Sequence, residues 1–442
     1  MKKNIVILIS VFLAIVAIIV AVLIGVKINN KNFKNDIENG VSNLSEESNE
    51  SNIEVANDKE IIKVGIQYGE RAYILDAAGR LYACGNRIGN KFVKILEGVK
   101  DVTETALGPA VTLTNNETYI ISDLSGLKYT DKTIDTEMGT GKRLEVDDKI
   151  IDFVPEGILL EGNYIQCLTE KGEVYKILND DSTKNAEKIN ENVKKISSNK
   201  LNISFIDNKN DAYVYGYNVT KEGILGTSKD YDVYKYNVVM DPVLVGSDIR
   251  DIITLSDLNF GALEIFALNN KNELFVMGRG KTSKNIISLL EKDINKLTKI
   301  DDDVKEMYPM LDSVLIKKND NSLYIFYGFE NSKNRKIMDN VKTVVTPAGY
   351  GGAFIINDKN ELWAFGRNDG GKFGIGEDIK TADEPIKVNT DVKRVFVSKS
   401  LSSSEVFIVK TDGSLYSAGV NHYKSLGVGD VEKVSTWTKV EY

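Results

Sequence analysis

Two stretches near the C-terminal end of the chain decide the fold: residues 360–377, NELWAFGRNDGGKFGIGE, and residues 413–430, GSLYSAGVNHYKSLGVGD. Each begins with Asn or Gly three residues before an aromatic residue, continues through a short apolar run to a Gly, and ends in a glycine-rich segment. Asn and Gly tolerate the left-handed backbone conformation that a tight β-hairpin needs in its turn. Each stretch is therefore predicted to start in a hairpin turn.

The same element, Gly or Asn followed three residues later by an aromatic residue, occurs eight times at a mean spacing of about 48 residues. The turn positions are Gly79, Asn116, Gly172, Asn210, Asn272, Asn321, Asn360 and Gly413, and the aromatic positions are Tyr82, Tyr119, Tyr175, Tyr213, Phe275, Tyr324, Trp363 and Tyr416. An apolar run precedes each turn, and two further runs lie upstream, as in residues 385–388 and 392–397. Each repeat therefore predicts four short strands.

Four-stranded units at this period predict an all-β fold, a closed β-propeller. Eight units are counted, with seven blades as the alternative, whereas an unrelated string of hairpins in a sandwich does not explain the repeated element. The first unit, residues 61–86, lacks a leading strand, and residues 437–442 have the pattern of a leading strand with nothing after it. We expect the two ends of the chain to complete one blade and so to close the ring, which removes exposed sheet edges.

These residues resemble the RCC1-like (regulator of chromosome condensation) repeat proteins, whose pattern is Gly, an aromatic strand, Gly-x-Asn and a Gly-Gln-Leu-Gly-x-Gly loop. Residues 209–226 retain part of this pattern, but the strand-end Gly is replaced by Ser122, Leu178 and Tyr327 in units two, three and six. The resemblance, which covers about 380 residues, implies a propeller, commonly of seven blades, that serves as an interaction platform. The exchange activity of the founding member on a small nuclear GTPase is not expected, because the chain is acidic and carries no motif for that partner. Bacterial secreted members that inhibit other proteins are a closer analogue.

The N-terminal segment predicts a membrane anchor. Residues 5–26 carry no charge and as a helix match the thickness of a bilayer core. A cleaved signal peptide is the competing interpretation, but its apolar region is normally shorter and no A-x-A-like site follows. We expect three parts: a transmembrane signal anchor at 1–26, a flexible acidic tether at 27–60, and the propeller at 61–442. The N-terminus is expected inside the cell and the propeller outside the cytoplasm.

Composition disfavours several functions. The net charge of −8 repels a polyanion, so no nucleic-acid partner is expected. With one histidine and two cysteines, Cys84 and Cys167, the chain lacks the parts of a Cys/His zinc site or a Ser-His-Asp centre. Asp301-Asp302-Asp303 and Asp147-Asp148 lack EF-hand spacing and predict solvated turns. The glycine-rich residues 366–376 lack a Gly-Lys-Ser/Thr ending, so their glycines are expected to form turns. No cofactor, metal or catalytic constellation is predicted.

Candidate binding residues come from the loops opposite the hairpin turns, because those loops emerge on one face of an antiparallel blade. The insertion at residues 228–237 contributes Tyr231, Tyr234 and Tyr236, of the side-chain type enriched in protein-binding sites. The other candidates are Tyr217, Tyr350, His422 and Tyr423. A second insertion, residues 281–296, places Ile286, Leu289, Leu290 and Ile294 at helical spacing and predicts a short helix.

The pattern as a whole favours a membrane-anchored extracytoplasmic binding module, a monomeric propeller that recognises a protein or cell-envelope ligand through one loop face. One alternative is an inhibitor whose loop face plugs the active site of an extracellular enzyme. Another is a polysaccharide-acting enzyme of the envelope, which needs two carboxylates across a cleft. The sequence names no partner.

Overall fold

The computed structural model of the chain describes residues 58–67, 69–121, 129–130, 133–134, 141–146, 148–154, 164–178, 186–198, 202–217, 238–256, 263–278, 294–310, 313–326, 335–347, 351–398 and 404–442. The expected anchor, residues 5–26, lies outside these residues. Among the described residues, no helix has the length and apolar character needed to cross a bilayer.

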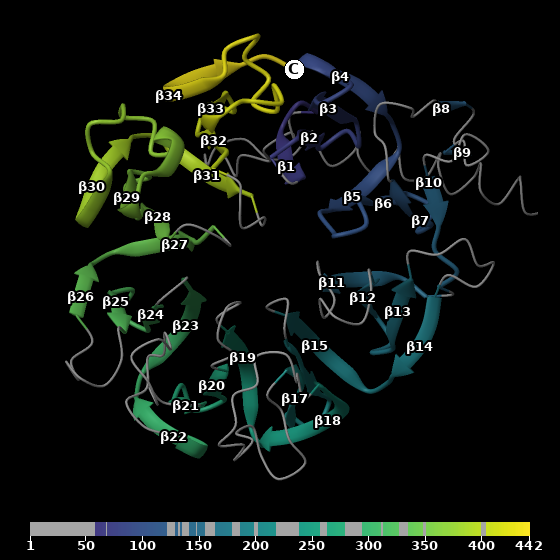
Figure 1. Ribbon diagram of the computed structural model, residues 1–442, viewed down its shortest axis with the longest axis vertical. Helices are drawn as coiled ribbons and strands as arrows, with labels where there is room; N and C mark the ends of the chain where they lie inside the picture. Colours follow the sequence, from purple (N-terminus) through teal and green to yellow (C-terminus); the bar gives the residue numbers. More distant parts are fainter. Residues whose placement is uncertain are drawn as a thin grey trace, which may run out of the picture. The chain divides into compact units, whose positions relative to one another are not determined.

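The strands of the described residues pair into eight four-stranded antiparallel sheets, which we call blades 1 to 8 in chain order (Figure 1). Blades 1 to 4 are β1 (Ile61–Gln67), β2 (Arg71–Asp76), β3 (Leu81–Gly85), β4 (Gly89–Leu96); β5 (Val99–Thr103), β6 (Ala110–Leu113), β7 (Thr118–Ile121), β10 (Gly141–Arg143); β11 (Ile150–Val154), β12 (Tyr164–Thr169), β13 (Val174–Leu178), β14 (Ala186–Asn190); and β15 (Val193–Ser198), β16 (Asn202–Asp207), β17 (Ala212–Tyr217), β18 (Val238–Gly246). Blades 5 to 8 are β19 (Ile249–Ser256), β20 (Leu263–Asn269), β21 (Leu274–Gly278), β22 (Ile294–Asp301); β23 (Val304–Pro309), β24 (Val314–Lys318), β25 (Leu323–Phe326), β26 (Arg335–Met338); β27 (Val341–Val345), β28 (Gly352–Asn357), β29 (Leu362–Arg367), β30 (Thr381–Asn389); and β31 (Val392–Val397), β32 (Val406–Lys410), β33 (Leu415–Val420), β34 (Lys433–Val440). A small hairpin, β8 (Tyr129–Thr130) with β9 (Thr133–Ile134), precedes β10, and a 3-10 turn η2 (Asp369–Gly371) follows β29.

The eight sheets confirm the predicted count of eight blades. The first strand of each blade lies on the inside of the ring and the fourth strand on its rim (Figure 1). Side chains on both faces of the second strands are buried, as in β2, β12 and β28, because each sheet packs against a neighbour on either side. The core is therefore a series of hydrophobic layers between adjacent blades.

All eight predicted turn residues have the left-handed conformation, with φ between 57° and 86°. The aromatic residue three positions later is half-buried in most blades and, in seven of the eight, packs against a hydrophobic cluster. Trp363, for example, packs on the cluster formed by Leu315 and Ile325 of blade 6 and Ile355 of blade 7. The repeated element thus fixes a turn and anchors one blade on the next.

The predicted division into blades was shifted by one strand. The run at 385–388 belongs to β30 and pairs with β29 of the preceding hairpin, not with the hairpin that follows. A residue with positive φ stands directly before the first strand of six blades and turns the chain from the rim back to the centre: Gly98, Asn192, Asp248, Asp303, Asn340 and Asp391. This Gly, Asn or Asp before Val or Ile is a sequence signal that marks the start of a blade.

The expectation that the two chain ends complete one blade is therefore wrong. β1 to β4 form blade 1 from one continuous segment, and the C-terminal strand β34 pairs with β33 inside blade 8. The ring closes through side chains: Ile61, Ile66 and Ile74 of blade 1 share a hydrophobic cluster with Phe407 and Leu426 of blade 8. A set of hydrogen bonds also crosses this seam, from Lys393 Nζ to Glu60 Oε1 (2.8 Å), Tyr442 OH to the Lys59 carbonyl (2.9 Å) and Asn90 Nδ2 to Asp430 Oδ2 (2.9 Å).

Cys84 and Cys167 are free and buried, and burial raises the pKa of both thiols. Two smaller predictions can also be compared with the structure. The predicted helix at 281–296 is wrong at its end, because residues 294–296 belong to β22 and Ile294 packs between blades. Residues 281–293 lie outside the described part. Asp303 forms a left-handed turn, so the prediction of a turn there is confirmed.

Candidate functional site

The two faces of the propeller are built differently. On one face, the hairpin turn of a blade accepts a hydrogen bond from the first amide of the next blade at six junctions: Val99 to Gly79, Val193 to Gly172, Ile249 to Asn210, Val304 to Asn272, Val341 to Asn321 and Val392 to Asn360, at 2.8–3.0 Å. This hairpin face is held together by the repeat itself. The loops after the first and third strands emerge on the opposite face, which we call the loop face, because successive strands are antiparallel.

The predicted binding residues fall into two groups. Tyr231, Tyr234, Tyr236 and Tyr350 lie outside the described residues, and Tyr217 is described only by its backbone, which pairs with Val238 in blade 4. His422 and Tyr423 lie on the loop face, in the segment between β33 and β34, and both side chains are exposed. The structure therefore brings His422 and Tyr423 together.

Two glycine-rich loops form the described part of this surface, residues 368–380 in blade 7 and 421–432 in blade 8. Each is braced by the asparagine that follows its strand. Asn368 donates from Nδ2 to the carbonyls of Gly376 and Ile379 and accepts at Oδ1 from the Phe373 amide (2.8 Å). Asn421 makes the corresponding bonds within the second loop and accepts from the Leu426 amide at 2.9 Å. These internal bonds replace strand pairing and give both loops the same shape.

Each loop inserts one apolar side chain into the interface with the following blade. Phe373 is fully buried among residues of blades 7 and 8, and its ring meets Phe354 edge-on with centroids 5.6 Å apart. Leu426 is likewise fully buried between blades 8 and 1. We call these two residues the plugs. The glycine after each plug is required by close packing, since a Cβ on Gly374 would lie 2.5 Å from the Trp437 ring and one on Gly427 2.6 Å from Phe92.

Four large apolar side chains project from the same loops into solvent: Ile375, Ile379, Tyr423 and Val431, which are 37%, 41%, 48% and 49% exposed. They are four of the ten large apolar side chains exposed among the described residues. We call them the loop patch. The blade 7 loop contacts the rim strand of blade 8, because Ile375 bridges to Thr436 of β34 and the Gly376 amide donates to the Ser435 carbonyl at 2.7 Å. Sequence reasoning missed three of the four, although Ile375 and Val431 adjoin the glycine repeats.

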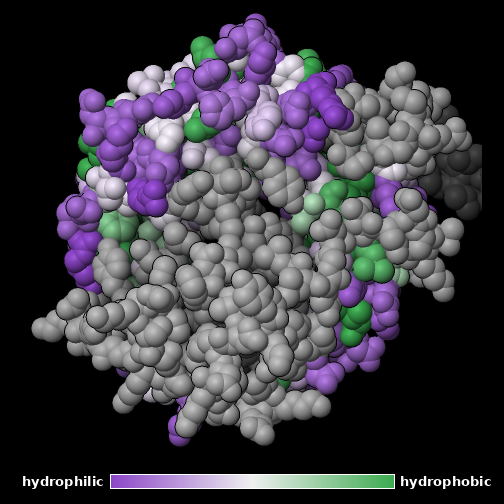
Figure 2. Space-filling view, in the orientation of Figure 1, coloured by the Kyte–Doolittle hydropathy of each residue, from purple (hydrophilic) through white to green (hydrophobic). Residues whose placement is uncertain are grey.

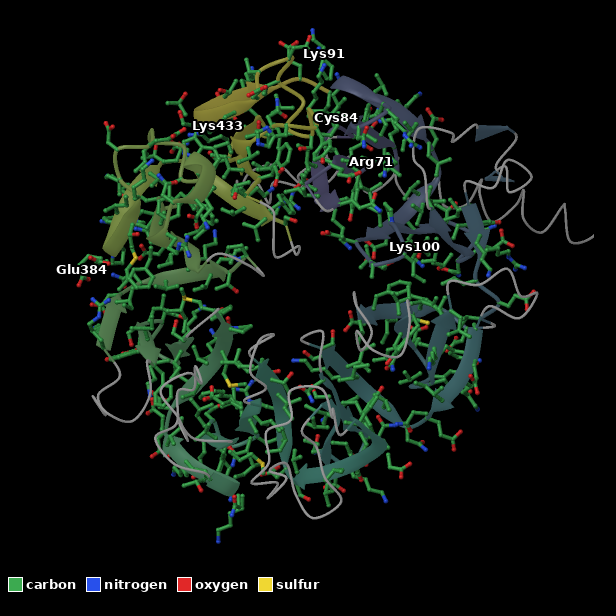
Figure 3. The ribbon with its side chains drawn as sticks, viewed as in Figure 1. Arg71, Cys84, Lys91, Lys100, Glu384 and Lys433 are labelled. Carbon is green, nitrogen blue, oxygen red and sulfur yellow. The ribbon has the colours of Figure 1, made fainter. Side chains whose placement is uncertain are left out.

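Charged groups surround the loop patch. Lys433 Nζ, at the start of β34, lies 2.7 Å from Glu377 Oε1 in the blade 7 loop, and its hydrogen bond lowers the pKa of that carboxyl. Lys424 pairs with Asp430 and likewise lowers its pKa. Below the surface, burial lowers the pKa of Lys372 to about 8. Figure 2 shows the described surface as mainly hydrophilic with separate hydrophobic residues, and Figure 3 places Lys433 toward the rim.

The described residues of the loop face have the character of a binding surface and do not form a metal site. In the described residues no group of three or more His, Cys, Asp or Glu side chains converges as metal ligands would. The glycines of residues 366–376 have positive φ at five positions, which confirms their predicted role in turns. Apolar and aromatic side chains on braced loops, with charges of both signs beside them, match the composition of protein-binding surfaces.

No protein-family model matches the chain. The chain is 31% identical over 90 residues to the protein RCC2 homolog of Xenopus laevis, a match that spans 20% of this chain and only 17% of that protein. Among solved structures, it is similar to yeast RCC1 (Prp20) in a complex with Kap60, at 18% identity and a TM-score of 0.46, over 66% of this chain and 75% of the yeast chain. It is also similar to human WBSCR16, at 16% identity and a TM-score of 0.44, over 68% and 84% of the two chains.

The repeats at residues 360–377 and 413–430, the local match to the Xenopus protein and the four-stranded blades agree with one another. Together they support an RCC1-like repeat β-propeller, the kind of protein to which this chain is similar.

Proposed function

We propose that this propeller is a protein-binding module and that it contacts its partner through the loop patch of blades 7 and 8. The observation that carries the proposal is the exposure of Ile375, Ile379, Tyr423 and Val431 on two loops that are internally braced. Large apolar side chains exposed on the loops of two adjacent blades are candidates for an interaction site.

The construction of the loops also supports binding. Loops held by Asn368, Asn421 and the two plugs lose little conformational freedom when a partner binds, so more of the contact energy remains as affinity. Tyr423 is of the residue type that most often dominates interface energetics. The ion pairs Glu377–Lys433 and Lys424–Asp430 form a polar rim that selects among partners by charge.

A photo-crosslinking experiment tests this proposal in cells that produce the full chain. A photoreactive phenylalanine analogue at position 423 is expected to give a discrete protein adduct. The same analogue at Leu244, which is 54% exposed on the rim strand β18, serves as the matched control and should give none. The triple variant I379S/Y423S/V431S should reduce the adduct formed from a second photoreactive position, 375, by at least about tenfold. Equal adducts from positions 423 and 244 would contradict the proposal.

We further propose that residues 5–26 anchor the chain in a membrane and that the propeller lies outside the cytoplasm. The support is the uncharged length of this segment, which matches a bilayer core. The acidic and polar residues that follow it would separate the propeller from the bilayer. In this arrangement the loop patch is open to proteins or ligands of the cell envelope.

Protease added to intact cells is expected to release the propeller as a fragment that begins within residues 27–57, because that stretch is rich in Asn, Ser and Glu and poor in apolar residues. The N-terminal sequence of the fragment locates the cut. Cells lysed before treatment provide the reference for complete cleavage. Protection of the propeller until lysis would reverse the proposed topology, and a mature N-terminus near Lys27 on untreated material would indicate a cleaved signal peptide.

A further inference from the structure

A cavity of about 280 Å³ lies between blades 3 and 4, away from the loop patch. It lies in an interface between two adjacent blades, a position that a plug residue fills in two other interfaces. Phe373 fills the interface of blades 7 and 8 beside Phe354 and Val406, and Leu426 fills the interface of blades 8 and 1. The corresponding connection in blade 3, residues 179–185, reads NDDSTKN and contains no apolar residue. By its sequence, this connection supplies no apolar side chain that could act as a plug.

The cavity and the plugged interfaces have different residue types at the strand positions that surround a plug. Strand register makes the positions comparable: Phe354 lies opposite Ala364 in blade 7, and Gln166 lies opposite Lys176 in blade 3. Likewise Ala418 lies opposite Val406 in blade 8, and Tyr215 lies opposite Ile203 in blade 4. Three apolar residues, Phe354, Ala364 and Ala418, are thus replaced by the polar residues Gln166, Lys176 and Tyr215.

These polar groups are arranged at the cavity wall rather than scattered. Gln166 and Tyr215 are 2% and 6% exposed, and Gln166 Nε2 donates to the Tyr215 hydroxyl at 2.6 Å. The Lys176 ammonium lies 4.3 Å from the centroid of the Tyr164 ring. Tyr164 and Phe205 supply flat apolar walls. A group bound in the cavity would contact the rings of Tyr164 and Phe205 at its sides and the polar groups of Gln166 and Tyr215 at its end.

We propose that this cavity binds a tyrosine side chain from an extended segment of a partner protein, which takes the place of the missing plug. The plugs show that one large side chain is the natural occupant of such an interface. A phenol ring fits the walls formed by Tyr164 and Phe205, and its hydroxyl reaches Gln166 and Tyr215, which a purely apolar ring would leave with poorer hydrogen bonding. The volume, near the lower limit of about 300 Å³ for ligand sites, suits one side chain.

The surroundings of the cavity favour a peptide over a free molecule. β14 is the last strand of its described sheet, so its outer edge offers backbone groups to an added strand. Ile189 of β14 lines the cavity and is 41% exposed. A segment that lies along β14 would bury Ile189 and direct one side chain between the blades. The proposal does not depend on the loop patch, which is on other blades.

Titration of the full chain with two capped peptides, Ac-Ala-Tyr-Ala-NH2 and Ac-Ala-Phe-Ala-NH2, tests the proposal by calorimetry or saturation-transfer NMR. The tyrosine peptide is expected to bind at least about tenfold more tightly than the phenylalanine peptide. Gln166→Leu should remove most of that difference, because it removes the hydrogen-bonding end. Ile189→Trp should block binding at the mouth, whereas Leu244→Trp, also exposed on a rim strand but outside the cavity, should not.

Each other outcome overturns the proposal in a different way. Equal binding of the two peptides would exclude recognition of the hydroxyl. Absence of saturable binding up to about 10 mM peptide, with blade packing intact by circular dichroism, would exclude the site. Binding of p-cresol without binding of the tyrosine peptide would mean that the cavity takes a free small phenol instead of a partner segment.

Discussion

Replacement of Gly419 by alanine is expected to prevent stable folding of blade 8. Gly419 is the last residue but one of β33, the far strand of its hairpin, with φ 120°, and a Cβ there would overlap the carbonyl oxygen of Ser404. That oxygen is a backbone atom two residues before the paired strand β32, so no side-chain rotation can move it aside. The cost is expected to reach at least about 4 kcal/mol, the range that marks a severe steric conflict. Urea unfolding followed by circular dichroism measures it.

Gly413 provides a matched control in the same hairpin. It also has a left-handed backbone, with φ 86°, but a Cβ there would meet no atom within 4 Å. Gly413→Ala therefore carries only the backbone penalty, about 1–2 kcal/mol. If the two variants unfold at the same urea concentration, the close approach of strands at the end of the hairpin is not what requires Gly419.

Removal of a plug is expected to have the second largest effect. Phe373→Ala deletes a fully buried ring from the interface of blades 7 and 8 and leaves a cavity beside Phe354, at a cost of about 3–5 kcal/mol. Leu426→Ala does the same at the seam of blades 8 and 1, with an expected cost of about 2–5 kcal/mol. Because that seam alone closes the ring, this variant should also make blade 1 more susceptible to proteolysis.

The control for the plug is Phe373→Leu, which keeps an apolar side chain of the size found at position 426. Its cost should stay below about 1.5 kcal/mol. Thermal unfolding and limited proteolysis of the three variants rank the effects. A Phe373→Ala variant as stable as Phe373→Leu would mean that the loop relaxes into the space, and the comparison between the plugged interfaces and the cavity of blades 3 and 4 would lose its basis.

The plug residues connect the stability predictions with the two proposed binding sites. Leu426 holds the loop that carries Tyr423, so its loss should also weaken the photo-crosslinked adduct at position 423. At the cavity between blades 3 and 4, the corresponding connection, residues 179–185, contains no apolar residue. One repeat therefore yields a fixed surface where the plug is present and a pocket where it is absent.

Local sequence was sufficient for the hairpins. The eight Gly or Asn turn residues and their aromatic partners were predicted correctly, because a left-handed turn depends on only a few consecutive residues. The count of eight blades followed directly from them. The strand-end glycines, such as Gly85 and Gly419, were also identified, although only the structure explains them by the approach of the paired strand.

The pairing of the outer strands was not predictable in the same way. The apolar run of β30 lies between two hairpins in the sequence and fits either of them by its pattern. The choice is made by the connections: Asp391 turns the chain within two residues to the centre of the next blade, whereas residues 368–380 return it to the same blade. This is why the two chain ends do not share a blade and why a packed seam closes the ring instead.

The binding surface was likewise only partly predictable from the sequence. Residue type and spacing were enough to predict a repeat propeller of eight hairpins and to place His422 and Tyr423 after the last repeat. They could not show that Phe373 and Leu426 are buried while Ile375, Ile379 and Val431 are exposed, because all five stand in similar glycine-rich loops. Which apolar side chain faces the next blade depends on the braces of Asn368 and Asn421 and on contacts between blades, and these bring together residues that are far apart in the sequence.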